Sequence, residues 1–361
     1  MIFGTYRYFL AHFVVLGHLY GWLCAWCGIY SVFGFYVLSG FLMTFILNEN
    51  YGFSGIGIRN YLFNRALRIY PAYYLVLALT ATVIFCFPDT ARSYNPHWFF
   101  PEKLSELIHN LTIVGLGSFF SVSLDASRIV EVAWALHLEL VFYLVIPFLA
   151  RNSKTTAIWL GSSLCYTAYL IISQAPWEHR YHALQSVSLP FSMGASAYYL
   201  FHKVQWGKNL SFSPRLLVLS LVLCFTNMVI APLYGHPFMI GFYINLFLQF
   251  FVVCMLCKIP FNALPGSLKR IDRFLGELSY PVYLIHLTVA GAIIIAVGRF
   301  PHPESPKLII AAVPIINIAS LLIVKFLDKR LKPLRNRVRG KCVESFHDGV
   351  RTRVRQHLLK H

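Results

Sequence analysis

Four polar residues of types that perform catalysis lie inside long apolar stretches of this sequence: His18, Ser39, Glu139 and His286. An ionisable side chain inside a membrane costs a few kcal/mol, so such residues are functional candidates by default. A histidine is the usual general base near neutral pH, and a carboxylate can orient the imidazole or stabilise its charge. One buried site shared by several helices would satisfy these groups more easily than four separate sets of partners.

Arg7 precedes His18 by eleven residues. That interval is close to three turns of α-helix, so both side chains share one helix face, about 16 Å apart along the axis. Taken alone, His18 also fits a packed histidine that bonds a neighbouring helix. Its combination with the other polar residues favours a functional role.

Two later apolar stretches carry polar and aromatic residues at helical spacing. These residues are Trp134, Glu139, Tyr143, Ser279, Tyr280 and His286. Tyr143 shares the helix face of Glu139 at i+4. A membrane-buried carboxylate needs a cationic or hydrogen-bonding partner, which the shared site would supply.

Arg65 and Arg68 stand directly before Ile69-Tyr70-Pro71. Pro71 suits the first turn of a helix, so both arginines are expected at the entrance of a membrane span, facing the same way. Arginine binds phosphate with bidentate geometry, which favours an anion clamp. The alternative is an ordinary basic anchor at the membrane surface.

The chain that positions these residues has the composition of a membrane protein. Of its 361 residues, 57% are hydrophobic and 12% are charged, whereas a soluble domain carries about 25% charged residues. Apolar runs long enough to cross a bilayer as helices recur along the whole chain. They span residues 8–27, 30–48, 70–88, 131–150, 155–173, 183–201, 216–233, 238–257, 274–297 and 308–326. We therefore expect an all-α integral membrane protein with about ten transmembrane helices.

The placement of lysine and arginine predicts the orientation. With the N-terminus inside, the inner segments hold 25 of the 31 basic residues and the outer loops hold 6. The positive-inside rule then places both termini in the cytoplasm. Residues 1–327 form the expected membrane domain, and residues 328–361 form a basic cytoplasmic tail that anionic lipid would attract. Nothing but charge supports a nucleic-acid partner for this tail.

Four motifs follow one another between residues 7 and 286. They are the Arg7-to-His18 spacing, Phe35-Tyr36-Val37-Leu38-Ser39-Gly40-Phe41-Leu42, Arg65-x-x-Arg68 before Ile69-Tyr70-Pro71, and Trp134-Ala135-Leu136-His137-Leu138-Glu139 paired with the run from Leu275 to His286. In order and spacing they resemble acyltransferase family three, membrane proteins that include O-antigen and other glycan O-acetylases. Gly4 and Ala135 depart from the pattern, since the family often has an acidic residue and a serine there.

The resemblance implies an acyl-CoA donor, acetyl-CoA by family default, and a hydroxyl acceptor on a glycan or lipid-linked sugar. It implies no tightly bound cofactor, and a bacterial inner (plasma) membrane is the expected location. His18 would be the general base, with Glu139 orienting it or stabilising its charge, and Arg7, Arg65 and Arg68 would bind the acyl-CoA. The acceptor or oxyanion side would comprise Ser39, Trp134, Tyr143, Ser279, Tyr280 and His286.

Two metal sites were weighed against this interpretation. Cys24, Cys27, Cys254 and Cys257 have the spacing of a four-thiolate zinc site, but the predicted topology puts the two pairs at opposite membrane faces. His18, His286 and Glu139 would also suit zinc, yet the resemblance implies no metal. We therefore expect none.

A multi-pass transporter or flippase is the alternative function, because polar residues at mid-membrane depth also describe a substrate pathway. The chain has no visible inverted repeat and few spans broken by Gly or Pro at matching positions, which weighs against transport. A purely structural membrane protein would leave the buried Glu139 and His18 unexplained.

Overall fold

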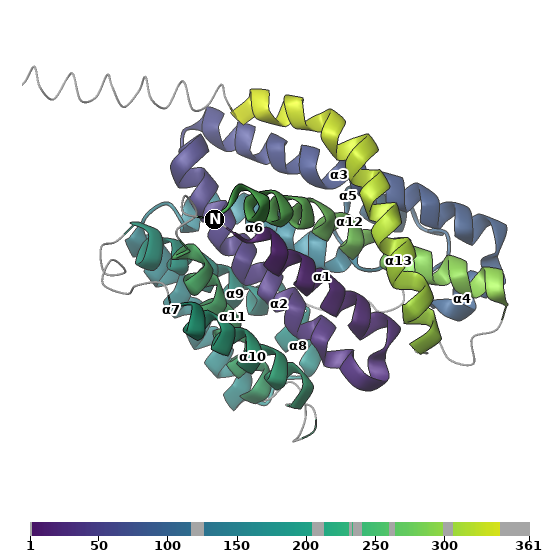
Figure 1. Cartoon of the computed structure of the whole chain (residues 1–361), viewed down its shortest axis with the longest axis horizontal. Helices are drawn as coiled ribbons and strands as arrows, with labels where there is room; N and C mark the ends of the chain where they lie inside the picture. Colours follow the sequence, from purple (N-terminus) through teal and green to yellow (C-terminus); the bar gives the residue numbers. More distant parts are fainter. Residues whose placement is uncertain are drawn as a thin grey trace, which may run out of the picture.

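A computed structural model describes residues 2–116, 126–203, 213–230, 233, 240–259, 264–298 and 306–339, except the side chains of 22–25 and 202–203. In this part of the chain the regular elements are helices, with no strand. The helices are α1 (Gly4–Leu19), α2 (Gly21–Ile46), η1 (Leu47–Tyr51), α3 (Gly55–Cys86), α4 (Pro88–Tyr94), α5 (Leu104–Thr112), α6 (Ala133–Leu149), α7 (Ser153–Ile172), α8 (Trp177–Tyr181), α9 (Leu184–Ala197), η2 (Tyr198–Lys203), α10 (Pro214–Ile230), α11 (Ile240–Cys257), α12 (Gly266–Val297), α13 (Pro306–Ile323) and η6 (Val324–Asp328) (Figure 1).

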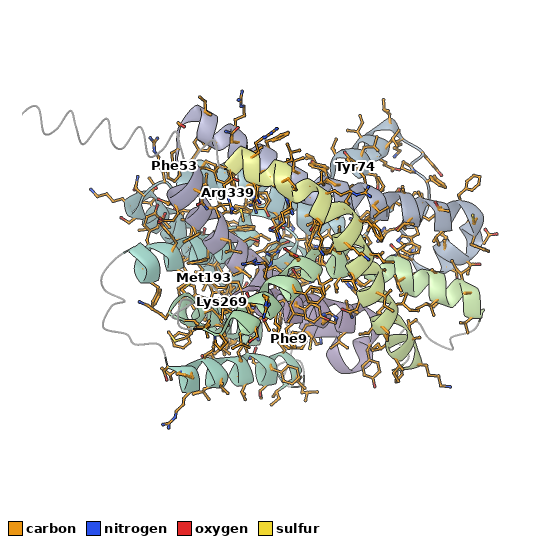
Figure 2. All side chains as sticks on the ribbon, turned by 45° about the horizontal axis from the view of Figure 1, so that its top comes forward. Phe9, Phe53, Tyr74, Met193, Lys269 and Arg339 are labelled. Carbon is orange, nitrogen blue, oxygen red and sulfur yellow. The ribbon has the colours of Figure 1, made fainter. Side chains whose placement is uncertain are left out.

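The all-α prediction is confirmed, and the ten predicted apolar runs fall on helices. Six helices of the described residues are long and apolar enough to cross a membrane, and α6 and α10 are shorter apolar helices. Large apolar side chains such as Phe9 and Tyr74 extend from the surface (Figure 2), as lipid-facing residues of a multi-pass protein do. The number of spans and their orientation stay predictions.

Two predicted helix boundaries were wrong. The run 8–27 covers parts of two helices, because the backbone of Tyr20 (φ −144°, ψ 54°) leaves the helical region between α1 and α2. Helix α3 begins at Gly55, where Ser54 Oγ accepts a hydrogen bond from Gly57 N (3.1 Å), an N-cap that satisfies a free backbone donor. Pro71 therefore lies in the middle of α3 rather than in its first turn. Arg65 and Arg68 likewise lie along the middle of this helix and not at its start.

Helix α1 lies between α2 and α12, and it is parallel to α12 over its length (Figure 1). Asp272 of α12 fixes this pairing, since its Oδ1 accepts hydrogen bonds from Thr5 N (2.7 Å) and Thr5 Oγ1 (2.9 Å). The first backbone N–H groups of a helix have no partner within it. A carboxylate from the neighbouring helix therefore caps α1 and sets the height of Arg7, half a turn further on.

Glycines allow this close approach of α1 and α12. A Cβ atom on Gly4 would lie 1.8 Å from the carbonyl oxygen of Asp272, and a Cβ on Gly276 would lie 2.7 Å from Cα of Gly4. These are backbone neighbours, which cannot rotate away as a side chain can. The two helices thus pack backbone to backbone at the level of Arg7.

We predict that Gly276→Ala lowers the thermal unfolding temperature of the detergent-solubilised protein, because overpacking costs about 1–3 kcal/mol. Gly161→Ala is the matched control, since a Cβ on Gly161 in α7 would meet no atom within 4 Å. Alanine there is expected to stabilise the helix slightly. Equal melting temperatures for the two variants would contradict the close backbone packing of α1 and α12.

The chain stays helical from Pro306 to Arg339, so the predicted domain boundary at 327/328 falls inside a helix. We call residues 329–339 the C-terminal extension. It packs on the body through Lys332, whose Nζ lies 2.9 Å from Glu277 Oε1, and through Asn64, whose Nδ2 donates to the carbonyl of Arg335 (2.9 Å). Residues 340–361 of the predicted tail, and the side chain of Cys24, lie outside the described residues.

Candidate active site

A cavity of about 580 Å³ opens among α1, α2, α3, α6, α12 and the C-terminal extension. Its lining along α12 begins at Lys269 and ends at Tyr283, an interval of about 21 Å at 1.5 Å per residue. The Lys269 end is basic, and the other end is aromatic, with Phe35, Tyr36 and Tyr283. The cavity is therefore long and polarised, with basic residues toward the Lys269 end and no charged residue at the Tyr283 end.

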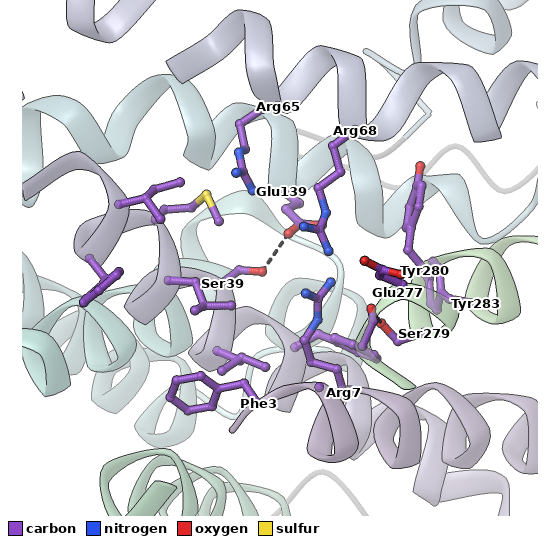
Figure 3. Close-up of a pocket in the computed structure, with 18 of the residues that line it drawn as sticks. Phe3, Arg7, Ser39, Arg65, Arg68, Glu139, Glu277, Ser279, Tyr280 and Tyr283 are labelled. Carbon is purple, nitrogen blue, oxygen red and sulfur yellow. Dashed lines mark hydrogen bonds between the residues drawn. The ribbon is translucent and has the colours of Figure 1, made fainter. Parts of the chain in front are cut away.

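Three arginines converge on the middle of this cavity. Arg65 and Arg68 of α3 point toward Arg7 of α1 (Figure 3), and the charges of Arg7 and Arg65 both act on Arg68. Among the described residues no carboxylate lies within ion-pair distance of the three, and Arg65 Nε is buried without a hydrogen-bond partner. Like charges held together in this way favour an anionic ligand.

Glu139 lies beside this cluster on α6 and supplies a negative charge that acts on Arg7. Its Oε1 accepts hydrogen bonds from Ser39 Oγ (2.6 Å) and from Tyr143 OH (2.5 Å) (Figure 3). Gly40 lets α2 meet α9 closely, because a Cβ there would lie 2.2 Å from the carbonyl oxygen of Phe191. Ser39 is turned to the cavity as a result.

His18 and His286 form a hydrogen-bonded pair one turn beyond the aromatic end of the cavity. His18 Nδ1 lies 2.8 Å from His286 Nε2, and the two rings are nearly parallel, at 12°. His286 is fully buried, whereas His18 is exposed on one side. The ring of Tyr283, which lines the cavity, has its centroid 6.4 Å from that of His286.

The contacts of the pair determine its tautomers when both rings are neutral. His286 Nδ1 lies 2.8 Å from the carbonyl oxygen of Tyr283, so this nitrogen must carry hydrogen. A neutral imidazole has one donor and one acceptor nitrogen, so His286 Nε2 accepts from Nδ1–H of His18. The lone pair of His18 is therefore on Nε2, free to accept a proton.

The predicted pairing of His18 with Glu139 does not occur. His286 occupies the position of an orienting partner, and Glu139 is bonded to Ser39 and Tyr143 instead. The carboxylate whose charge acts on His18 is Glu131, in the turn before α6, where Asn95 Nδ2 donates to it. Sequence reasoning missed Glu131, although a lone acid at the start of an apolar helix was the available signal.

The other predicted residues divide between the cavity and the surface beyond it. Ser279 and Tyr280 line the cavity, but Ser279 Oγ donates to the carbonyl of Gly276 (2.9 Å) and Tyr280 OH donates to that of Ile69 (3.0 Å). Their hydroxyl protons already bond backbone, so neither is a ready oxyanion donor. Trp134 lies outside the cavity lining.

Trp134 lies in the first turn of α6 and belongs to a group of aromatic rings there. Its ring lies 4.4 Å from that of His182 and 5.2 Å from that of Tyr181. Burial, together with the positive charge of Arg128, lowers the pKa of His182 to about 4. His182 is thus neutral near pH 7, and Trp134 and His182 together present an uncharged aromatic surface. Within the described residues no three His, Cys, Asp or Glu side chains gather as metal ligands.

Comparisons with known proteins identify a family for this chain. The family described as "Acyltransferase domain" matches residues 4–325. A protein of Acidianus two-tailed virus named "Putative acetyltransferase ORF330" is 26% identical over 258 residues, which cover 70% of each chain. No solved structure shows significant similarity.

Proposed function

The chain belongs to the acyltransferase domain family, and from this premise we propose that it moves an acyl group from a coenzyme A thioester to a sugar hydroxyl. As a multi-pass membrane acyltransferase it needs a donor site and a base, which the cavity and the histidine pair would provide. The observation that carries the proposal is the arrangement along α12, where cationic, then aromatic, then imidazole groups follow in line. A coenzyme A thioester has the same order, with phosphates at one end and the reactive carbonyl at the other.

In this proposal the arginine cluster of Arg7, Arg65 and Arg68 binds the diphosphate. Arginine is suited to this because its fork of N–H donors matches phosphate oxygens. The uncharged pantetheine arm then extends along α12 past Phe35 and Tyr283. Glu139 accepts hydrogen bonds from Ser39 and Tyr143, and its negative charge reduces the repulsion among the arginines. It is therefore a positioning residue in this scheme.

His18 acts as the general base through Nε2. The acceptor O–H proton moves to Nε2 as its oxygen bonds to the thioester carbonyl carbon, and the C–S bond then breaks. The proton on Nε2 passes to the departing thiolate, which yields the ester and the free coenzyme A thiol. His286 keeps His18 in the reactive tautomer, and Glu131 stabilises the transient imidazolium charge.

In this proposal the acceptor approaches His18 from its exposed side, and the uncharged rings of Trp134 and His182 are the aromatic surface offered for a sugar ring. Aromatic faces suit the apolar faces of sugar rings, which supports a glycan or lipid-linked sugar as acceptor. With the basic cavity mouth on the cytoplasmic side of an inner membrane, donor and acceptor meet from opposite faces of the bilayer.

A label-transfer assay tests this function. Membranes from cells that express the protein receive acetyl-labelled coenzyme A, and glycan and lipid fractions are counted against membranes lacking it. Label in a sugar-containing fraction supports the proposal. Absence of label from acetyl, succinyl and longer acyl donors, with folded protein present, would overturn it in favour of transport.

We predict that His286→Leu lowers kcat about 10²-fold with donor KM unchanged, because His18 loses the acceptor that sets its tautomer. His286→Gln is the matched variant, since its side-chain oxygen lies near the position of Nε2 and still accepts from His18 Nδ1–H. It should retain activity within about tenfold of the wild type. If both variants lose activity equally, ring shape rather than hydrogen bonding is what His286 contributes.

A further inference from the structure

We propose that the C-terminal extension belongs to the donor site, where Arg339 forms a second anion subsite with Lys269 and Arg273 at the cavity mouth. The proposal rests on the function proposed above and names the group that this subsite binds, the ribose 3′-phosphate of coenzyme A. Arg339 lies beyond residue 325, where the family match ends. The subsite therefore joins two residues within the family match, Lys269 and Arg273, to one residue beyond it.

The extension presents one basic face to the body of the protein. Lys332, Arg335 and Arg339 follow at intervals of three and four residues, which places them on the same side of a helix. Lys332 pairs with Glu277 (2.9 Å), and Arg335 pairs with Asp328 (3.5 Å). In the described part of the chain Arg339 has no such acidic partner and lines the cavity instead.

The backbone contact of Arg335 with Asn64 fixes the position of Arg339 along the axis of the extension, relative to the arginine cluster. Asn64, the neighbour of Arg65, donates to the Arg335 carbonyl, so this point of the extension lies beside the arginine cluster. Arg339 follows one turn later, about 6 Å further along the helix axis. On α12, Lys269 and Arg273 line the mouth about two turns and one turn, respectively, before Gly276, which packs against Gly4. Lys269 and Arg339 both line the cavity.

The charges of the cavity form two groups at different depths. Six basic side chains line it, three in the inner cluster and three at the mouth, against the carboxylates of Glu139, Asp272 and Glu277. Asp272 is bonded to Thr5 and Glu277 to Lys332. Two separated cationic groups match a ligand that carries two separated phosphate groups. Coenzyme A has this pattern, with its diphosphate between the pantetheine and the ribose and a further phosphate on the ribose.

The test compares the affinity of the purified full-length protein for coenzyme A and for 3′-dephospho-coenzyme A, which needs no acceptor. Wild type should bind coenzyme A more tightly. Arg339→Gln should weaken coenzyme A binding about tenfold and leave dephospho-coenzyme A binding unchanged, as expected for one charged hydrogen-bonding group. Arg337→Gln is the matched control, since Arg337 is exposed on the same helix and does not line the cavity.

The outcomes separate this inference from the proposed function. No binding of coenzyme A to wild type would defeat the donor assignment itself. Binding by wild type with equal effects of Arg339→Gln and Arg337→Gln would overturn only the second subsite. Equal weakening of both ligands by Arg339→Gln would also overturn it, because Arg339 would then not distinguish the 3′-phosphate.

Discussion

His18→Gln is expected to lower kcat for acyl transfer about 10²–10⁴-fold, the range that a positioned general base supplies. The donor KM should change little, because Arg7 is about 16 Å from His18 along α1 and the other arginines cluster around Arg7. Glutamine has a similar length and polarity, so folding should be preserved. Steady-state kinetics with labelled acyl-CoA measures both constants.

His12→Gln provides the control on the same helix. His12 Nδ1 contacts the Tyr8 carbonyl oxygen (3.0 Å), and its Nε2 faces Asn317 of α13 (3.1 Å), on a different side of α1 from the histidine pair. Its replacement should alter kcat only a few-fold. Activity of His18→Gln within tenfold of the wild type would rule out His18 as the base.

The double variant Arg65→Gln/Arg68→Gln is expected to lower kcat/KM for the acyl-CoA about 10²–10⁴-fold. Each charged hydrogen-bonding group contributes about 1.5–3 kcal/mol to binding, and two such groups give this range. The same variant should melt at a higher temperature than ligand-free wild type at low salt, because repulsion with Arg7 is removed. Loss of function with gain of stability is the pattern expected of a binding site whose like charges repel one another until an anionic ligand is bound.

Arg59→Gln controls for charge on the same helix, since Arg59 is exposed and lies outside the cavity lining. It should change neither kcat/KM nor the melting temperature appreciably. Coenzyme A should raise the melting temperature of wild type and of Arg59→Gln but not of the double variant. A double variant that melts lower than wild type and is still stabilised by coenzyme A would contradict the anion-site assignment.

Composition and hydropathy were sufficient to predict an all-helical membrane protein, and the order and spacing of four motifs indicated its family. They did not locate the break at Tyr20, because a single non-helical residue between two apolar helices leaves no polar gap in a hydropathy average. They also placed Pro71 at a helix start, since proline favours that position, whereas Ser54 and Gly57 form the actual start of α3. The preference of proline for the first turn did not decide where α3 begins, because the capping residue Ser54 lies seventeen positions upstream.

The site was predicted in its residues more than in its contacts. Counting along spans put His18, Glu139 and His286 at similar depths, but depth leaves the rotation of each helix and the choice of neighbours undetermined. The close crossing of α1 and α12 at Gly4 and Gly276 aligns these two helices, and this brings His18 to His286 rather than to Glu139. Arg339 was missed because a run of basic residues after the last apolar segment predicts a surface tail equally well.

The hydrogen-bond chain from His18 through His286 ends at the carbonyl oxygen of Tyr283, and a carbonyl has no proton to pass on. A proton taken up at Nε2 of His18 can reach His286, but it cannot leave through the backbone oxygen and must return the way it came. His18 and His286 together can thus hold one extra proton, but they cannot conduct it to another group. If His18 is the base, as proposed, a membrane acyltransferase built in this way would turn over without passing protons across the bilayer through this pair.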